Sequence, residues 1–218
     1  MNVIELLNEN FLLEKQVGNS LLLLDIDDTL LTAQNIFIYR KLSTDKAEVR
    51  LTPEQYAKDP ASTVKSNKQY YDYREFRNAD KVAQSIKTGL PIVPNLKEMD
   101  RYIQRGWKIG ILTARGMEDV IAKTMQEWLK IRNKKGELVD VDLPRRLVNA
   151  INDDNKHYPG ATDFEKKTNV IKKLSKKFNQ IIFVDDDIKN VKAVKNMVKE
   201  EGIKNVMVKF ATAKPGDK

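Results

Sequence analysis

Short runs rich in leucine and β-branched residues, several of them followed by acidic or threonine-containing turns, constrain the fold of this chain more than any other feature. They lie at residues 21–24, 108–112 and 181–184, and a further run lies at 206–210. Runs without polar alternation are typical of strands that are buried on both faces of a parallel sheet. We therefore predict that these segments are neighbouring parallel strands.

Amphipathic helical patterns separate the apolar runs. Apolar residues recur three and four positions apart at 95–104, 118–131, 164–178 and 188–200, which indicates helices with one buried face. Strands that alternate with helices predict an α/β fold with a Rossmann-like, doubly wound parallel sheet. A further helix is expected at residues 1–15.

Two stretches interrupt this alternation. Residues 32–90 are polar and are expected to form a largely helical, cap-like insertion over the carboxyl ends of the strands. The insertion carries an aromatic cluster of Tyr70, Tyr71, Tyr73 and Phe76. Residues 133–163 combine prolines with mixed charge, which is typical of a short loop-rich insert. The predicted core domain therefore consists of residues 1–31 and 91–218.

The composition excludes several classes of protein. The chain has no cysteine and a single histidine, His157, so structural disulfides, zinc–thiolate sites and a cysteine nucleophile are excluded. The run at 21–24 is too short to span a bilayer, and the N-terminal residues do not resemble a signal peptide. We expect a soluble, cytoplasmic protein without a transmembrane segment. The formal charge of +8 favours an anionic partner, although surface lysines usually serve only solvation.

Acidic and hydroxyl side chains follow the strands at the edge where ligands bind in such sheets. Asp25 and Asp27 follow the first strand, Thr113 ends the second, and Asp185 and Asp186 follow the third. Carboxylates that converge on one crevice repel one another unless a divalent cation neutralises them. Mg²⁺ prefers oxygen ligands of this kind. The sequence therefore predicts a Mg²⁺ site at this edge.

The same groups suit a phosphate ester. A carboxylate can attack phosphorus, a metal can screen its charge, and a hydroxyl with an ammonium group can hold the non-bridging oxygens. Because Asp25 and Asp27 are two residues apart, their side chains would point the same way on a strand. That arrangement would place a nucleophile and a proton donor beside one substrate. Arg115 is open between a phosphate contact and a helix cap.

These residues resemble the motifs of the haloacid dehalogenase (HAD) superfamily of aspartate-nucleophile phosphatases. Its four motifs are matched in chain order by Asp25, Asp27 and Thr29, by Thr113, by Lys167, and by Asp185, Asp186 and Asn190. Lys166 is the alternative for the lysine motif. Because three aspartates follow one another, Asp187 is the alternative to Asp186.

The resemblance implies a role for each residue. Asp25 would attack the phosphoryl group, and Asp27 would protonate the leaving oxygen and later activate water. Thr113 and Lys167 would bind the transferring phosphoryl group. The implied Mg²⁺ ligands are Asp25, Asp27 through its backbone carbonyl, Asp185 and Asp186, with Thr29 and Asn190 in support. The implied activity is phosphomonoester hydrolysis through an aspartyl-phosphate.

A closer resemblance is to the HAD-like tyrosine phosphatase effectors of Legionella. It rests on Asp-Ile-Asp-Asp-Thr-Leu at 25–30, Leu-Thr-Ala-Arg-Gly at 112–116 and Val-Asp-Asp at 184–186. It implies a phosphotyrosine protein as substrate and, for a secreted bacterial effector, the host cell as location.

Several alternatives stay open. The substrate could instead be a small molecule or a nucleic-acid end, and the chain could be a HAD-scaffold binding module for anionic partners. Its lysine-rich segment at 166–177 is most simply a solvated helix face. Nucleic acid is not favoured as a partner because no RNA-binding signature accompanies that segment. Peripheral contact with acidic membranes is a minority alternative.

Overall fold

The structure is a computed structural model of the 218-residue chain. It describes residues 19–41, 48–59, 71–132, 135–213 and 216–217. The helix predicted at residues 1–15 and the aromatic residue Tyr70 lie outside the described residues. Within the described part, no helix is both long enough and apolar enough to cross a membrane.

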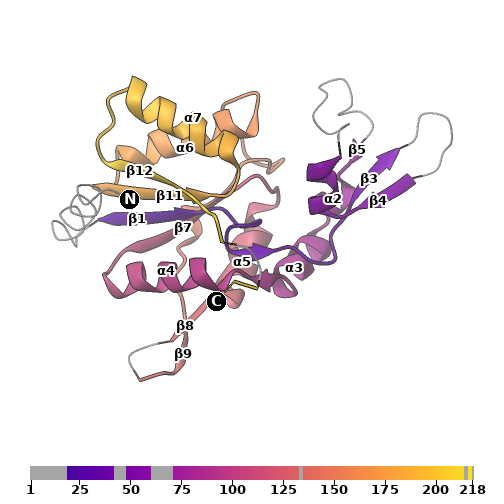
Figure 1. The fold of residues 1–218 in the computed structure, drawn as a ribbon, viewed down its shortest axis with the longest axis horizontal. Coiled ribbons are helices and arrows are strands. Elements are labelled where there is room, and N and C mark those ends of the chain that lie inside the picture. Colours follow the sequence, from indigo (N-terminus) through magenta and orange to yellow (C-terminus); the bar gives the residue numbers. More distant parts are fainter. Residues whose placement is uncertain (1–18, 42–47, 60–70, 133–134, 214–215, 218) are drawn as a thin grey trace.

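A five-stranded, wholly parallel sheet forms the centre of the molecule (Figure 1). Its order is β10-β7-β1-β11-β12, and its strands are β1 (Ser20–Leu24), β7 (Lys108–Thr113), β10 (Val148–Ala150), β11 (Gln180–Asp185) and β12 (Val206–Phe210). One face carries α4 (Val93–Gln104) and α5 (Glu118–Trp128), and the other carries α6 (Asp163–Ser175) and α7 (Ile188–Glu200). The predicted Rossmann-like, doubly wound α/β class is confirmed.

The central strand β1 explains why its apolar run has no polar alternation. Leu21 and Leu23 belong to the core cluster that includes α6 and α7, whereas Leu22 and Leu24 belong to the cluster that includes α4 and α5. Successive side chains of a strand point to opposite faces, and both faces of this sheet are covered by helices. All four leucines are therefore buried.

The helices follow their predicted ranges, with differences at the ends. The range of α7 is as predicted, while α5 and α6 end at Trp128 and Ser175. Leu129 and Phe178 continue the apolar pattern beyond these ends and are buried. The apolar pattern therefore indicates which residues are buried in the core. Buried residues follow the last helical residue, so the pattern is longer than the helix.

The segment 133–163, expected as a loop-rich insert, supplies an edge strand of the central sheet. Val148 pairs with Ile111 and Ala150 with Thr113. A strand of three residues is too short to show a periodic pattern in the sequence. The segment also contains β9 (Leu138–Asp140), which pairs with β8 (Lys130–Arg132) just before the segment, and the short 3-10 helix η4 (Arg145–Leu147).

In its described residues, the insertion at 32–90 combines helices with strands, whereas a largely helical segment was expected. Its outer part is an antiparallel sheet of order β4-β3-β5. The elements are β2 (Leu31–Thr32), β3 (Ile38–Lys41), β4 (Glu48–Leu51), α2 (Pro53–Lys58), β5 (Tyr71–Asp72), η3 (Arg74–Arg77), α3 (Ala79–Lys87) and β6 (Leu90–Pro91). Exposed and half-buried residues alternate along β4, which is the strand pattern that the polar composition obscured.

The insertion is attached to the core through α3. Val82 and Ile86 of this helix are fully buried in the same cluster as α4 and α5. The outer sheet projects away from the core (Figure 1). The buried Glu75 joins β3 to η3, because its carboxylate accepts hydrogen bonds from Phe37 N at 2.8 Å and from the Tyr39 hydroxyl at 2.5 Å.

Candidate active site

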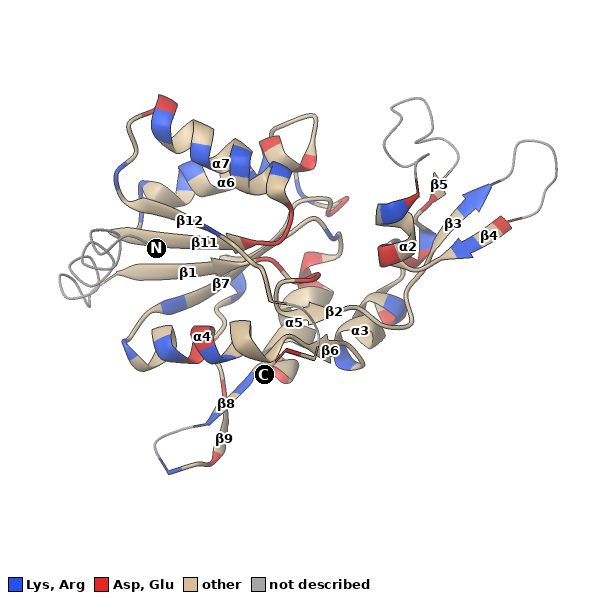
Figure 2. Ribbon diagram, viewed as in Figure 1, with Lys and Arg blue, Asp and Glu red and all other residues tan. Residues whose placement is uncertain are grey.

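Two neighbouring strands bring three carboxylates together. Leu24 of β1 pairs with Val184 of β11, so Asp25 and Asp185 lie at the same edge of the sheet. One carboxylate oxygen from each of Asp25, Asp185 and Asp186 lies within 4.8 Å of the others. Acidic residues also gather at this edge in the charge distribution of the whole fold (Figure 2).

Lys167 is buried among these carboxylates. Its side chain is 1% exposed, and its Nζ atom lies 2.7 Å from Asp185 Oδ2 and 3.2 Å from Asp25 Oδ1. The alternative lysine, Lys166, instead donates a hydrogen bond to Asn152 Oδ1 on the exposed side of the helix. Helix α6 begins with a capping box at Thr162, which fixes the phase that turns Lys167 inward.

The pKa values of Asp25 and Lys167 are shifted by burial and by the charges of their neighbours. Burial raises the pKa of Asp25 well above its ordinary value, Lys167 lowers it, and Asp185, Asp27 and Asp186 raise it again. Burial lowers the pKa of Lys167, but the charges of Asp25 and Asp185 outweigh burial, and the pKa is raised overall. Lys167 therefore stays an ammonium ion.

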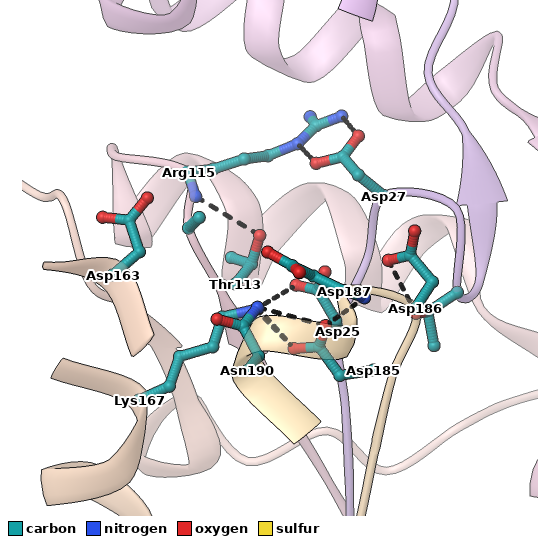
Figure 3. Close-up of polar contacts among 12 residues, drawn as sticks. Asp25, Asp27, Thr113, Arg115, Asp163, Lys167, Asp185, Asp186, Asp187 and Asn190 are labelled. Atoms are coloured by element: carbon teal, nitrogen blue, oxygen red, sulfur yellow. Dashed lines mark hydrogen bonds and ion pairs between the residues drawn. The ribbon is translucent and has the colours of Figure 1, made fainter. Parts of the chain in front are cut away.

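The loop after β11 is held by its own polar groups. Asp185 Oδ1 accepts a hydrogen bond from Asp187 N at 2.8 Å, and Asn190 Nδ2 lies 3.1 Å from both oxygens of the same carboxylate (Figure 3). Asp187 caps α7 through Lys189 N at 2.8 Å. Asp186, the remaining carboxylate of the loop, is the one that faces Asp25 and Asp185.

Thr113 and Thr29 are buried next to this cluster. Thr113 ends β7, and its hydroxyl oxygen accepts a hydrogen bond from Arg115 N at 3.3 Å. The Thr29 hydroxyl donates a hydrogen bond to Asp186 Oδ1 at 3.5 Å. The Thr29 backbone carbonyl accepts a hydrogen bond from Asn95 Nδ2 at 2.7 Å, a contact from α4 that no sequence motif indicated.

Asp27 lies in a tight turn after β1, whereas strand geometry was expected for it. Leu30 N bonds to Ile26 O at 2.9 Å, and Asp28 N bonds to Leu31 O at 2.9 Å. Asp28 has a left-handed φ of 51°, which aspartate tolerates better than most residues. The Thr32 hydroxyl donates to its side chain at 2.7 Å.

Beyond this turn, the Asp27 side chain has a partner that no sequence motif indicated. The Asp27 carboxylate faces Arg115, whose Nε and Nη2 atoms each lie 2.7 Å from one of its oxygens (Figure 3). Arg115 is buried, and it does not cap α5, whose N-cap residue is Met117. Burial lowers its pKa, but the charge and hydrogen bonds of Asp27 raise the pKa overall.

A further buried carboxylate, Glu118, supports the adjoining loop. It opens α5 and contacts Arg145, Lys156 and the Tyr158 hydroxyl, and it accepts a hydrogen bond from Ala150 N at 3.2 Å. Burial raises the pKa of Glu118, but these partners outweigh burial and lower it overall. Because partners surround this carboxylate, we assign it to the scaffold and not to the chemistry.

The residues fit a hard divalent cation. Asp25 Oδ1 is buried, and within the described part of the chain it has the Lys167 ammonium 3.2 Å away as an ion-pair partner but accepts no well-oriented hydrogen bond, which leaves a lone pair for a ligand. Asp185 and Asp186 place further carboxylate oxygens beside it. Oxygen donors of this kind are typical of Mg²⁺ sites that keep some water ligands. Asp25, Asp185 and Asp186 would hold such an ion.

Comparisons with known proteins give the following likenesses. The sequence profile of a family described as "Protein of unknown function (DUF2608)" matches residues 167–218. No curated protein matches the sequence. Among solved structures, the chain is similar to the HAD domain of effector protein Lem4 from Legionella pneumophila, with 16% identity, a TM-score of 0.42, and coverage of 92% of this chain and 88% of that chain. An inactive mutant of that domain matches with 15% identity, a TM-score of 0.42 and the same coverage.

Proposed function

We propose that this chain is a Mg²⁺-dependent, HAD-type phosphatase that hydrolyses phosphomonoesters through an aspartyl-phosphate on Asp25. The observation that carries the proposal is the buried Lys167 ammonium between Asp25 and Asp185, with Asp186 beside them. Burying several charged groups together costs free energy. A cluster of this kind therefore favours a functional site. A phosphoryl group needs the same mixture of nucleophile, cation and hydroxyl.

Asp25 acts as the nucleophile in the proposed reaction. One of its carboxylate oxygens forms a bond to phosphorus while the bond from phosphorus to the leaving oxygen breaks, and Asp27 supplies the proton to that oxygen. Water then attacks phosphorus while Asp27 accepts its proton, and the bond from phosphorus to the Asp25 oxygen breaks, which restores the Asp25 carboxylate and releases inorganic phosphate. Thr113 and Lys167 hold the non-bridging oxygens, and bound Mg²⁺ supplies charge neutralisation.

Protein phosphotyrosine is the proposed substrate class within this activity. Phe164 and Ile188, at the first turns of α6 and α7, are 36% and 46% exposed and precede Lys167 and Asn190 by less than one helical turn. Exposed apolar side chains near a phosphoryl site favour an aromatic leaving group over a sugar. They support this substrate class better than the tyrosines of the insertion.

The aromatic cluster of the insertion has a structural role in its described part. Tyr56 packs edge-on against Tyr71 and Tyr73, at 5.0 and 5.8 Å between ring centroids. The Tyr73 hydroxyl donates to the Tyr56 hydroxyl at 2.7 Å. Through these contacts, the aromatic rings join α2 to β5.

Hydrolysis of p-nitrophenyl phosphate with and without Mg²⁺ tests the activity. Wild type should turn over only with the metal, and Asp25→Asn should abolish turnover. Asp154→Asn, which changes an exposed aspartate outside the cluster, is the matched control and should keep full activity. Full activity in Asp25→Asn would exclude covalent catalysis by this residue. A panel of phosphotyrosine peptides, phosphoserine peptides, nucleotides and sugar phosphates then ranks the substrates.

A binding module for anionic partners is the second candidate. The observation in its favour is the row of exposed lysines along α7 (Figure 2), namely Lys189, Lys192, Lys195 and Lys199. Such a row could contact nucleic-acid phosphates or acidic lipids. Absence of metal-dependent hydrolysis together with binding to anionic vesicles would favour this candidate over the enzyme.

A further inference from the structure

Each of the three guanidinium nitrogens of Arg115 donates a hydrogen bond to a protein partner. Its Nε and Nη2 atoms bind the two oxygens of Asp27, at 2.7 Å each, in a bidentate fork. Its Nη1 atom donates to Ser85 Oγ at 2.9 Å. An arginine that bound substrate phosphate would need this planar fork free. Here the fork is directed at the proposed proton donor.

Ser85 anchors the guanidinium to the insertion. Ser85 is fully buried on α3, where its hydroxyl donates to Val82 O at 2.8 Å and its oxygen accepts from Arg115. Val82 and Ile86 fix the same helix in the core. A continuous set of hydrogen bonds therefore joins α3 to Asp27.

The backbone of the Arg115 loop is held as firmly as its side chain. Asn152 N donates to Arg115 O at 3.3 Å, and Asn152 Nδ2 donates to Ala114 O at 2.7 Å. A Cβ atom added to Gly116 would lie 2.8 Å from Asn152 O. The loop thus packs tightly on its neighbour, and the guanidinium starts from a fixed position.

Asp27 needs such support more than the other carboxylates do. Its side chain is 36% exposed, whereas the side chains of Asp25 and Asp185 are 9% and 0% exposed. A solvent-facing carboxylate samples several rotamers unless a partner selects one. Proton transfer requires the donor within hydrogen-bond reach of the leaving oxygen.

We propose that Arg115 is the positioning residue for Asp27, and that Ser85 sets the place of Arg115. The inference rests on the proposed phosphatase reaction. In that reaction a proton moves from Asp27 to the leaving oxygen as the bond from phosphorus to that oxygen breaks. A leaving group that is stable as an anion needs this proton little, whereas a poor leaving group depends on it.

The test compares leaving groups. Arg115→Lys keeps the charge but removes the fork, so kcat/KM on phenyl phosphate should fall about tenfold more than on p-nitrophenyl phosphate. Asp27→Asn should show the same pattern more strongly, and Ser85→Ala should show it more weakly. The Mg²⁺ concentration for half activity should stay unchanged in Arg115→Lys, because lysine keeps the positive charge beside the carboxylates. Arg101→Lys, at an exposed position on α4, is the control.

Equal fractional losses on both substrates, or no loss on either, would overturn the proposal. If Arg115→Lys does not fold, the same comparison of the two substrates is made with Ser85→Ala. If wild type hydrolyses no phosphate ester, the phosphatase proposal fails, and a double-mutant cycle between Arg115→Lys and Asp27→Asn still decides the pairing. Non-additive changes in the urea midpoint support the positioning contact, and additive changes refute it.

Discussion

Replacing Lys167 by methionine should destabilise the protein strongly in the absence of divalent metal. The substitution preserves most of the side-chain volume but removes the ammonium that contacts Asp25 and Asp185. Removing one partner of a buried ion pair costs about 3–5 kcal/mol, because the remaining charge stays buried without a partner. Domains of this kind have a free energy of unfolding of about 5–15 kcal/mol, so a large share of the stability would be lost.

Urea unfolding in EDTA, followed by tryptophan fluorescence, measures this loss. Trp107 is buried in the core and reports on its opening. With a urea dependence of about 2 kcal/mol per M, a loss of about 3–5 kcal/mol lowers the midpoint by about 1.5–2.5 M. Mg²⁺ should restore more stability to Lys167→Met than to wild type, because the cation replaces the missing charge.

Lys166→Met is the matched control for this experiment. Lys166 lies one residue away, and its ammonium contacts the exposed Asn152. A surface change of this kind is expected to alter the free energy of unfolding by about 0.5 kcal/mol or less. The reasoning is refuted if the two methionine variants unfold at the same urea concentration.

Three further changes test the surroundings of the site. The pKa of Glu118 is lowered below its ordinary 4.5, so its charge stabilises the fold above that pH, and this stabilisation is lost as pH falls through the lowered pKa. In Glu118→Gln, the melting temperature should therefore fall less steeply with decreasing pH than in wild type. An equally steep fall in both proteins would contradict this. Gly116→Ala should cost about 1–3 kcal/mol in urea unfolding, because the new Cβ must displace Asn152; a neutral result would show that the loop yields. Asp186→Ala should weaken Mg²⁺ binding in calorimetry, whereas Asp187→Ala should retain it and lose about 1 kcal/mol of capping; the opposite ranking would exchange their roles.

The layers of the fold could be predicted because burial leaves a periodic trace in the sequence. The run 21–24 reports a strand covered on both faces, and 188–200 reports a helix with one buried stripe. Shorter elements leave no such trace. The edge strand β10 has three residues, and its pairing with β7 depends on contacts far away in the sequence.

The convergence of Asp25, Asp185 and Lys167 could be anticipated because parallel strands share one carboxyl edge and α6 leads into β11. The direction of Asp27 could not. It depends on a left-handed residue at Asp28 and on Arg115, which lies 88 positions away in the chain. Sequence spacing gives the residue types at a site, but a turn decides where each side chain points.

The seam at the base of the outer sheet has a consequence for engineering. Tyr39 and Asp72 lie opposite each other on adjacent strands, while α3 remains packed on the core. A replacement hairpin joined at these two positions would change the outer sheet while leaving the helix that packs on the core unaltered. Chimaeras exchanged at these positions would show whether the outer sheet affects the substrate preference of the proposed phosphatase.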